Sequence, residues 1–336
     1  MFKGALKICI CGAKEVNIEV PCNWRELSFG VEIEFSFIKR AKAAEIVSDF
    51  FKTSYFHSGD KYDTYEIEDF QQRIWKVVRD GSVTPEKKID GIVVQASDYY
   101  KVELVTPILY YKQDMEILQK LVRKLRKSGA KANNDTGVHI HIGAKFFENN
   151  PNNLRILCNM VYSKQNLLER AIQVHNNRKR FCELLSDDFI KKLNKVKPKT
   201  LKEFADIWYG FDTQKAGYQG YRSNKYHKSR YRILNLHNLL SGRMKCIEFR
   251  IFNGTLHSGV IKSYVQFCLL LTAQSLNQSR ASCKQKSTIN ERWSMRIWLL
   301  NIGMIGEEFK TARHHLIKFM EGDCAFKNKV LEGCTF

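Results

Sequence analysis

The sequence has no apolar run long enough to cross a membrane. The longest, around Phe267–Leu271, falls well short of the ~18 residues that a transmembrane helix needs. The N-terminal segment has a short apolar stretch but no small-residue cleavage site, so no signal peptide is expected. These absences exclude a membrane-spanning protein and predict a cytoplasmic one.

The sequence also lacks a C-x-x-C pair, although it contains ten cysteines. Without such a pair, and with no fourth ligand beside them, Cys9, Cys11 and Cys22 match structural zinc sites poorly. Strand residues that face a core explain Cys9 and Cys11 at least as well. No cysteine–histidine pair stands out as a nucleophilic dyad, so most of the thiols are expected to be free.

Acidic residues are scarce relative to basic ones, 35 against 55, which gives a net charge of +20. A field of this sign favours partners such as nucleotides, nucleic acid or acidic polymers. In Lys120–Lys131, however, apolar residues recur at helical spacing. This predicts an amphipathic helix with Asp114 near its start and Gly129 at its end. Arg222–Arg232 interleaves tyrosines with cations and is either a substrate- or phosphate-binding loop or an exposed basic loop.

Three short apolar stretches each carry two polar residues that are two positions apart. They are Glu32 and Glu34 in FGVEIEF, His139 and His141 in TGVHIHIG, and Glu248 and Arg250 in CIEFRIF. Because side chains alternate along a β-strand, both members of each pair point to one face of a sheet. Carboxylates, imidazoles and a guanidinium on one face predict a metal and phosphate site.

Each pair also has an ordinary structural interpretation. Two neighbouring carboxylates repel each other unless a cation such as Mg²⁺ or Mn²⁺ lies between them, but glutamates on an exposed strand face need no cation. Paired histidines ligate a metal, donate to phosphate, or are structural. Glu248 and Arg250 suit phosphoryl transfer or form a buried ion pair. Glu103, a lone carboxylate in VELVTPIL, is commonly an edge residue. Together, the three pairs favour the functional interpretation.

The apolar patterns predict strands and helices in mixed order. The strands expected are two short ones within residues 5–21, FGVEIEF, Ile74–Val78, Val102–Val105, the His-x-His segment and the Glu-x-Arg segment. The helices expected are residues 40–56, 113–127, 152–174 and 259–277, a basic helical insertion near 178–228, and helices in the C-terminal tail. This order predicts an α+β fold with an antiparallel sheet backed by helices.

The motifs, in this order, resemble a known family. TGVHIHIG is similar to the G-x-H-x-H strand of glutamine synthetases, and CIEFR followed by FNGT resembles their E-x-R strand. FGVEIEF resembles the G-x-E-x-E strand that they share with glutamate–cysteine ligases. With ELVTP between them, the set resembles the amidoligase family of bacteria, fungi and phages, and residues 29–272 carry the resemblance.

The resemblance implies a curved sheet like that of the glutamine synthetase catalytic domain. It places a catalytic domain at residues 29–280, which includes the basic insertion near 178–228. Residues 1–28 are then an N-terminal strand extension, and residues 281–336 are a helical tail packed on the catalytic domain.

The resemblance also implies an ATP-dependent ligase that joins a carboxylate to an amine through an acyl phosphate. The implied ligands of Mg²⁺ or Mn²⁺ around the triphosphate are Glu32, Glu34, Glu103, His139, His141 and Glu248. Arg250 would stabilise the transferred phosphoryl group, with Glu34 as a further catalytic residue. The implied cofactor-binding residues are Arg230, Arg232, Asn235, Arg250 and His141.

Asp80-Gly81-Ser82 resembles a turn that receives the amine in glutamine synthetases. In this chain the turn follows the Glu-x-Glu strand instead of preceding it. Asp80 therefore either has that catalytic role or only shapes a turn.

Two other functions stay open at this point. The same carboxylates and histidines suit a metal-dependent hydrolase or nuclease, whose polyanionic substrate the positive charge would hold. A non-catalytic nucleic-acid-binding protein would use the charge but would not need the glutamate and histidine pairs.

Overall fold

The computed structural model describes residues 5–6, 18–19, 21–210 and 224–327. Near the N-terminus, β1 (Ala5–Leu6) pairs with β2 (Ile18–Glu19) in antiparallel fashion, within the segment where two short strands were expected. Cys9 and Cys11 lie outside the described residues. Among the cysteines that are described, none forms a disulfide.

A nine-stranded sheet forms the centre of the molecule, and every pair of neighbouring strands in it is antiparallel. In spatial order, the strands are β12 (Leu234–Asn235), β13 (Cys246–Asn253), β11 (Gly137–Gly143), β3 (Ser28–Phe35), β9 (Val102–Val105), β6 (Ile74–Val78), β5 (Tyr65–Glu68) and β4 (Tyr55–His57), with β10 (Leu109–Tyr110) paired to β3. The antiparallel sheet predicted from the sequence is confirmed, and the three motif strands are neighbours at its centre.

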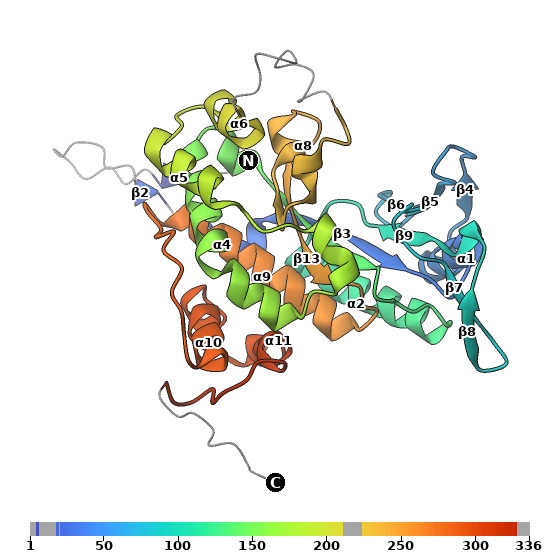
Figure 1. Cartoon of the computed structure of the whole chain (residues 1–336). Coiled ribbons are helices and arrows are strands. Elements are labelled where there is room, and N and C mark those ends of the chain that lie inside the picture. The colour runs from blue at the N-terminus through green and yellow to red at the C-terminus, as the bar shows by residue number, and fades with distance from the viewer. Residues whose placement is uncertain (1–4, 7–17, 20, 211–223, 328–336) are drawn as a thin grey trace, which may run out of the picture.

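The alternation of side chains in β3 gives the sheet two different faces. Phe29, Val31, Ile33 and Phe35 are buried on one face, whereas Glu32 and Glu34 point to the other. The apolar face is covered by helices: α1 (Arg40–Phe51) lies against β5 and β6, and α9 (Ser258–Asn277) lies against β11. Figure 1 shows α9 running beneath the sheet beside α4 (Pro151–Ile172). The motif side chains are thus on the face without these helices.

The helix α2 (Tyr111–Lys127) packs between α1 and α9 and follows the predicted amphipathic pattern. Its buried residues include Met115, Leu118, Leu121, Val122 and Leu125. Asp114 accepts a hydrogen bond from the backbone N–H of Tyr110 at the helix start (2.8 Å), and Gly129 has the positive φ typical of a helix end. Its cations are therefore the solvated side of a structural helix.

The remaining segments surround this core. They are η1 (Trp24–Glu26), the hairpin β7 (Glu86–Ile89) and β8 (Ile92–Gln95), η2 (Asp98–Tyr100), α3 (Lys145–Glu148), η3 (Asn176–Phe181), α5 (Asp187–Val196), α6 (Leu201–Tyr209), η5 (Lys228–Tyr231), α8 (His237–Leu240), α10 (Glu291–Asn301), η6 (Glu307–Phe309) and α11 (Lys310–Ile317). In the C-terminal part, Trp298 of α10 packs edge-on against Phe267 of α9 with ring centroids 5.3 Å apart. This contact ties α10 to the helices beneath the sheet.

One helix is shorter than its sequence pattern predicts. The helix expected at residues 40–56 ends at Phe51, because Lys52 takes a left-handed conformation (φ +57°) and its N–H bonds to Ser48 O. The chain then enters β4, so that Tyr55 and Phe56 belong to the edge of the sheet. Within the described ranges, no helix is both long and apolar enough to span a membrane.

Candidate metal and phosphate site on the open face of the sheet

The strand register brings the motif side chains together on the face of the sheet that α1 and α9 leave open. Glu32 lies opposite His139, Glu34 lies opposite Glu103, and His141 lies opposite Glu248. Residues opposite each other in an antiparallel pair share a face, so β9, β3, β11 and β13 present these groups side by side. Four carboxylates and two imidazoles, distant in sequence, therefore form one cluster.

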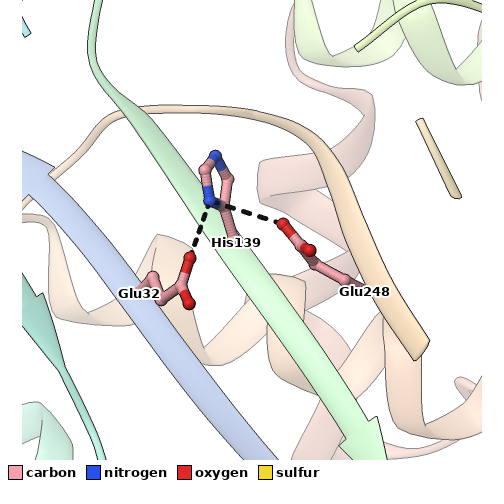
Figure 2. Close-up of side chains that lie close together, drawn as sticks. All are labelled: Glu32, His139 and Glu248. Carbon is pink, nitrogen blue, oxygen red and sulfur yellow. Dashed lines mark hydrogen bonds and ion pairs between the residues drawn. The ribbon is translucent and has the colours of Figure 1, made fainter. Parts of the chain in front are cut away.

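His139 lies at the centre of this cluster (Figure 2) and is 3% exposed. Its Nδ1 lies 3.0 Å from Glu32 Oε2 and 3.6 Å from Glu248 Oε1. On the other side of the ring, Nε2 lies 3.5 Å from Glu34 Oε1 but makes no hydrogen bond. Nδ1 thus faces Glu32 and Glu248, whereas Nε2 faces Glu34.

Two sets of ligand atoms are close enough together to hold a metal ion. Glu32, His139 and Glu248 form one set, and Glu34, Glu103 and His139 form the other; within each set the atoms lie within 4.8 Å of one another. Carboxylate oxygens supplemented by imidazole suit divalent cations such as Mg²⁺ or Mn²⁺. His139 belongs to both sets.

Among the described residues, neither Glu34 nor Glu103 forms an ion pair with a lysine or an arginine, and Glu34 contacts only His139 in this way. Glu34 accepts a hydrogen bond from the backbone N–H of Gly137 (2.6 Å), but burial raises its pKa. Burial also raises the pKa of Glu103 well above its usual range, and repulsion from Glu32, Asp80 and Glu34 adds to this effect. A cation bound between these groups would remove the repulsion.

His141 extends the cluster toward β13. Its Nε2 lies 3.0 Å from Glu32 Oε1 without forming a hydrogen bond, and its Nδ1 lies 3.5 Å from Cys246 Sγ. Burial alone would lower the pKa of His141, but the carboxylates of Glu32 and Glu248 outweigh it and raise the pKa well above the usual range. In Glu32, burial would raise the pKa, but His141 and His139 lower it well below its usual range.

Arg250 supplies the cation of the cluster. It is 6% exposed and forms an ion pair with Glu248, while its Nε donates to Phe181 O (3.2 Å). The other carboxylate oxygen of Glu248 accepts a hydrogen bond from Asn235 Nδ2 (2.7 Å). Burial opposes the charge on Arg250, but Glu248 outweighs it and the pKa of the guanidinium is raised. Arg250 therefore keeps its charge at this depth.

Arg178 was not identified from the sequence, but it supports the same strands through their backbone carbonyls. It is 2% exposed and donates to Phe252 O (2.6 Å) and Arg250 O (3.0 Å). A Cβ on Gly137 would collide with its guanidinium. The first glycine of the G-x-H-x-H motif thus leaves room for Arg178 where the register of β11 and β13 shifts. No local signal marks this arginine, which lies in a basic segment of otherwise ordinary appearance.

Comparison with known proteins decides the family. The sequence matches the family described as "Putative amidoligase enzyme" over residues 25–272, which is most of the chain. The chain belongs to this amidoligase family. The resemblance drawn from the ordered motifs is therefore confirmed, and membership supports a carboxylate–amine ligase, a C–N bond-forming enzyme, as the kind of function.

Other comparisons add little to this family assignment. A bifunctional glutathione synthetase from Pasteurella multocida is similar in structure, with a TM-score of 0.39 and 11% sequence identity. The match covers 88% of this chain and 47% of that protein, so the amidoligase spans about half of its length. A likeness at this TM-score supports no inference about fold or function. No protein of the curated collection matches the sequence.

The remaining predicted site residues of the amidoligase lie at different distances from the cluster. Asp80 shapes its turn by accepting hydrogen bonds from Ser82, and it also lies close enough to Glu34 and Glu103 to raise their pKa values. The guanidinium of Arg230 lies over Tyr231, with its Cζ 5.5 Å from the ring centroid. Asp80 therefore borders the carboxylates, whereas Arg230 shares the Tyr231 ring with Arg250, whose Cζ lies 5.9 Å from the ring centroid.

Arg232 is not brought into the cluster. Its Cζ lies 4.2 Å from the ring centroid of Trp208 and 5.5 Å from that of Phe189, among the helices of the basic insertion. Within the described part of the chain, its Nη1 is buried without a hydrogen-bond partner. The role predicted for it in phosphate binding stays a prediction.

A surface hollow of about 910 Å³ lies elsewhere, between the end of α4 and the chain around residues 288–292 and 319–322. None of the carboxylates or histidines of the cluster lines it. In this amidoligase the candidate site is therefore identified by strand register and charge.

Proposed function

We propose that the protein is an ATP-dependent ligase that joins a carboxylate to an amine through an acyl-phosphate intermediate. One observation carries the proposal: in a chain of the amidoligase family, two carboxylate–imidazole sets and a buried arginine meet on the sheet face that α1 and α9 do not cover. Such an arrangement suits the transfer of a phosphoryl group between two anions, which repel each other unless their charges are screened.

The donor set fits a divalent cation. Four carboxylates lie beside His139, His141 and Arg250, and among the described residues the buried Nε2 atoms of both histidines have no hydrogen-bond partner. We assign Glu32, Glu34, Glu103, His139, His141 and Glu248 as the residues that would hold Mg²⁺ or Mn²⁺. When bound, the metal supplies positive charge that orients the triphosphate and screens it from the attacking carboxylate.

Arg250 is assigned to the transferred phosphoryl group. Glu248 and Phe181 O fix its guanidinium, and Asn235 fixes Glu248 in turn. A rigid, buried cation stabilises charge that develops on the phosphoryl oxygens at little cost in reorganisation. Arg230 contacts the same Tyr231 ring as Arg250 and is assigned, like Arg232, to the triphosphate or the carboxylate substrate.

The finer fold and domain assignments belong to the same proposal. We infer that the sheet is of the glutamine synthetase catalytic-domain type and that residues 29–280 form the catalytic unit. Asp80, at the edge of the carboxylates, is the candidate to receive the amine.

The test is release of ADP from ATP and Mg²⁺ with pools of carboxylates and amines. A ligase requires both an acid and an amine, and a carboxylate labelled with ¹⁸O would pass one label to inorganic phosphate, as an acyl phosphate demands. Hydrolysis that needs no amine would instead identify a metal-dependent hydrolase.

Variants locate the activity in the cluster. Glu34→Gln should abolish ADP release, because it removes a carboxylate while preserving shape. Glu66→Gln is the matched control: Glu66 is paired with Lys76 (2.6 Å) on β5 and β6, outside the cluster. If both variants keep full activity, the proposed site is wrong.

A further inference from the structure

Cations and tyrosine rings alternate along a path that leads from the surface to the candidate site. Each neighbouring pair on this path makes a cation–ring contact, with distances to the ring centroid of 4.9–5.9 Å. In order, the members of this cation–tyrosine ladder are Lys61, Tyr62, Lys225, Tyr226, Arg230, Tyr231 and Arg250. Its last member is the arginine paired with Glu248.

The ladder becomes more buried along its length. Lys61 and Lys225 are exposed and Tyr226 is 55% exposed, whereas Arg230 and Tyr231 are half-buried and Arg250 is 6% exposed. A ligand that enters along the ladder would therefore pass from solvent to the phosphoryl-transfer end of the cluster.

The ladder also joins two segments that are far apart in the sequence. Tyr62, in the turn between β4 and β5, forms a hydrogen bond with Tyr226 through their hydroxyl groups (2.7 Å), and Lys225 Nζ donates to Tyr62 Oη (3.0 Å). Figure 1 shows β4 and β5 at one end of the molecule and α8, which follows the Tyr226 segment, above its centre. This contact bridges from the far edge of the sheet to the segment before β12.

Among the described residues, the outer cations of the ladder have no carboxylate partner. Within residues 21–210 and 224–327, no ion pair involves Lys61, Lys225 or Arg230, whereas Arg40 and Arg73 are each paired with two aspartates. Positive charge is thus concentrated along the path, and no described carboxylate forms an ion pair with its outer part. A cation pre-positioned by a ring loses less side-chain freedom when it meets an anion.

We propose that the ladder binds an acidic peptide segment and guides one of its carboxylates to Arg250 as the carboxylate substrate. The inference rests on the proposed ligase function, and it names the substrate as a chain rich in Asp or Glu. Cations placed at intervals along the ladder can pair with carboxylates placed at intervals along a peptide.

Nucleic acid fits the ladder less well than an acidic peptide does. Single-stranded nucleic acid binds by stacking its bases on aromatic rings. Here the rings of Tyr62, Tyr226 and Tyr231 each contact two cations, one that precedes the ring along the ladder and one that follows it. Bases would have to displace those cations, whereas carboxylates would pair with them.

The experiment measures fluorescence anisotropy of the intact protein with fluorescein-labelled octaglutamate, and separately with labelled oligothymidylate of eight nucleotides. Octaglutamate should bind more tightly and lose affinity with added salt. Lys225→Gln and Lys61→Gln should each weaken its binding about threefold, and the double variant about tenfold, as expected for exposed charge pairs. Tyr62→Phe, which removes the hydroxyl bridge and no charge, should weaken it less.

Lys228→Gln is the matched control, because Lys228 is an exposed lysine of η5 that contacts no ring among the described residues. If Lys228→Gln and Lys225→Gln weaken octaglutamate binding equally, binding depends on general surface charge and not on the ladder. That result would overturn the proposal. Tighter binding of oligothymidylate, lost in Lys225→Gln, would overturn it in favour of nucleic acid. Octaglutamate binding is measured without ATP, so it can succeed even if ligase activity fails, and the two proposals are tested separately.

Discussion

Two groups of buried charges in this molecule are built in different ways. In the first, which we call the aspartate–arginine network, Arg73 donates to both carboxylate oxygens of Asp114 (2.9 and 3.0 Å) and to Asp69 (2.9 Å). The indole N–H of Trp75 also donates to Asp69 (3.0 Å). In the second, the sheet-face cluster, Glu32, Glu34, Glu103 and Glu248 surround one arginine and two histidines whose Nε2 atoms lack hydrogen bonds.

We attribute a structural role to the first group and a functional role to the second. In the network, hydrogen bonds satisfy each carboxylate, as buried charges require for stability. In the cluster, the pKa of Glu103 is raised well above its usual range by burial and by neighbouring carboxylates. On the proposed function, a cation from solution would relieve this repulsion.

The largest expected effect concerns activity. Arg250→Gln should lower the rate of ADP release about a thousandfold or more, equivalent to about 4 kcal/mol of transition-state stabilisation, because no other cation of the cluster can replace it. Arg73→Gln, measured at a temperature where circular dichroism shows it folded, should keep its activity. If the two variants lose activity equally, the functional distinction between the two groups fails.

The next effect concerns stability. Asp114→Ala should lower the free energy of unfolding by about 3 kcal/mol. The change leaves Arg73 with a single carboxylate partner and removes the hydrogen bond to the N–H of Tyr110. Urea denaturation followed by circular dichroism measures the change. A loss below about 0.5 kcal/mol, which is typical of surface positions, would show that the network does not stabilise the fold.

The smallest effect has the opposite sign. Without metal, Glu103→Gln should raise the free energy of unfolding by about 1 kcal/mol, because one of several mutually repelling carboxylates is removed. In the native protein, Mg²⁺ at ten times its dissociation constant should add about 1.4 kcal/mol, and Glu103→Gln should diminish this gain. Thermal melts with EDTA and with Mg²⁺ compare the four states; a destabilised Glu103→Gln in EDTA would mean that the cluster is balanced without a metal.

Much of the sheet could be predicted because local sequence patterns determine it. The strand at Val102–Val105 has the predicted bounds, and the period of two in FGVEIEF places Glu32 and Glu34 on one face. That β3, β11 and β13 are neighbours was not predicted, and only the folded chain shows it. These patterns do not contain the pairing of β4 with β5 and of β5 with β6 at the sheet edge. That pairing depends on turns rather than on apolar periodicity.

The rest of the site depends on contacts between distant segments. Arg178 reaches the carbonyl of Arg250, 72 residues away in the sequence, and only the folded chain reveals this contact. The basic segment at residues 222–232 contains Arg230 and Arg232, which are two positions apart, yet Arg230 lies over Tyr231, the ring that Arg250 also contacts, while Arg232 lies over Trp208. Spacing in a loop does not fix direction as it does in a strand, so sequence alone could not separate the two arginines.

The position of His139 between two carboxylate sets has a consequence for the ligands that a metal ion would have in each set. A neutral imidazole has one lone pair available and one N–H, on opposite sides of the ring. If Nδ1 ligates a cation beside Glu32 and Glu248, then Nε2 carries the proton and turns a donor toward Glu34; the reverse holds if Nε2 is the ligand. The set on the other side of the ring would then lack the His139 nitrogen. The two candidate ligand sets would therefore be unequal, and the single proton on His139 would determine which of them has that nitrogen.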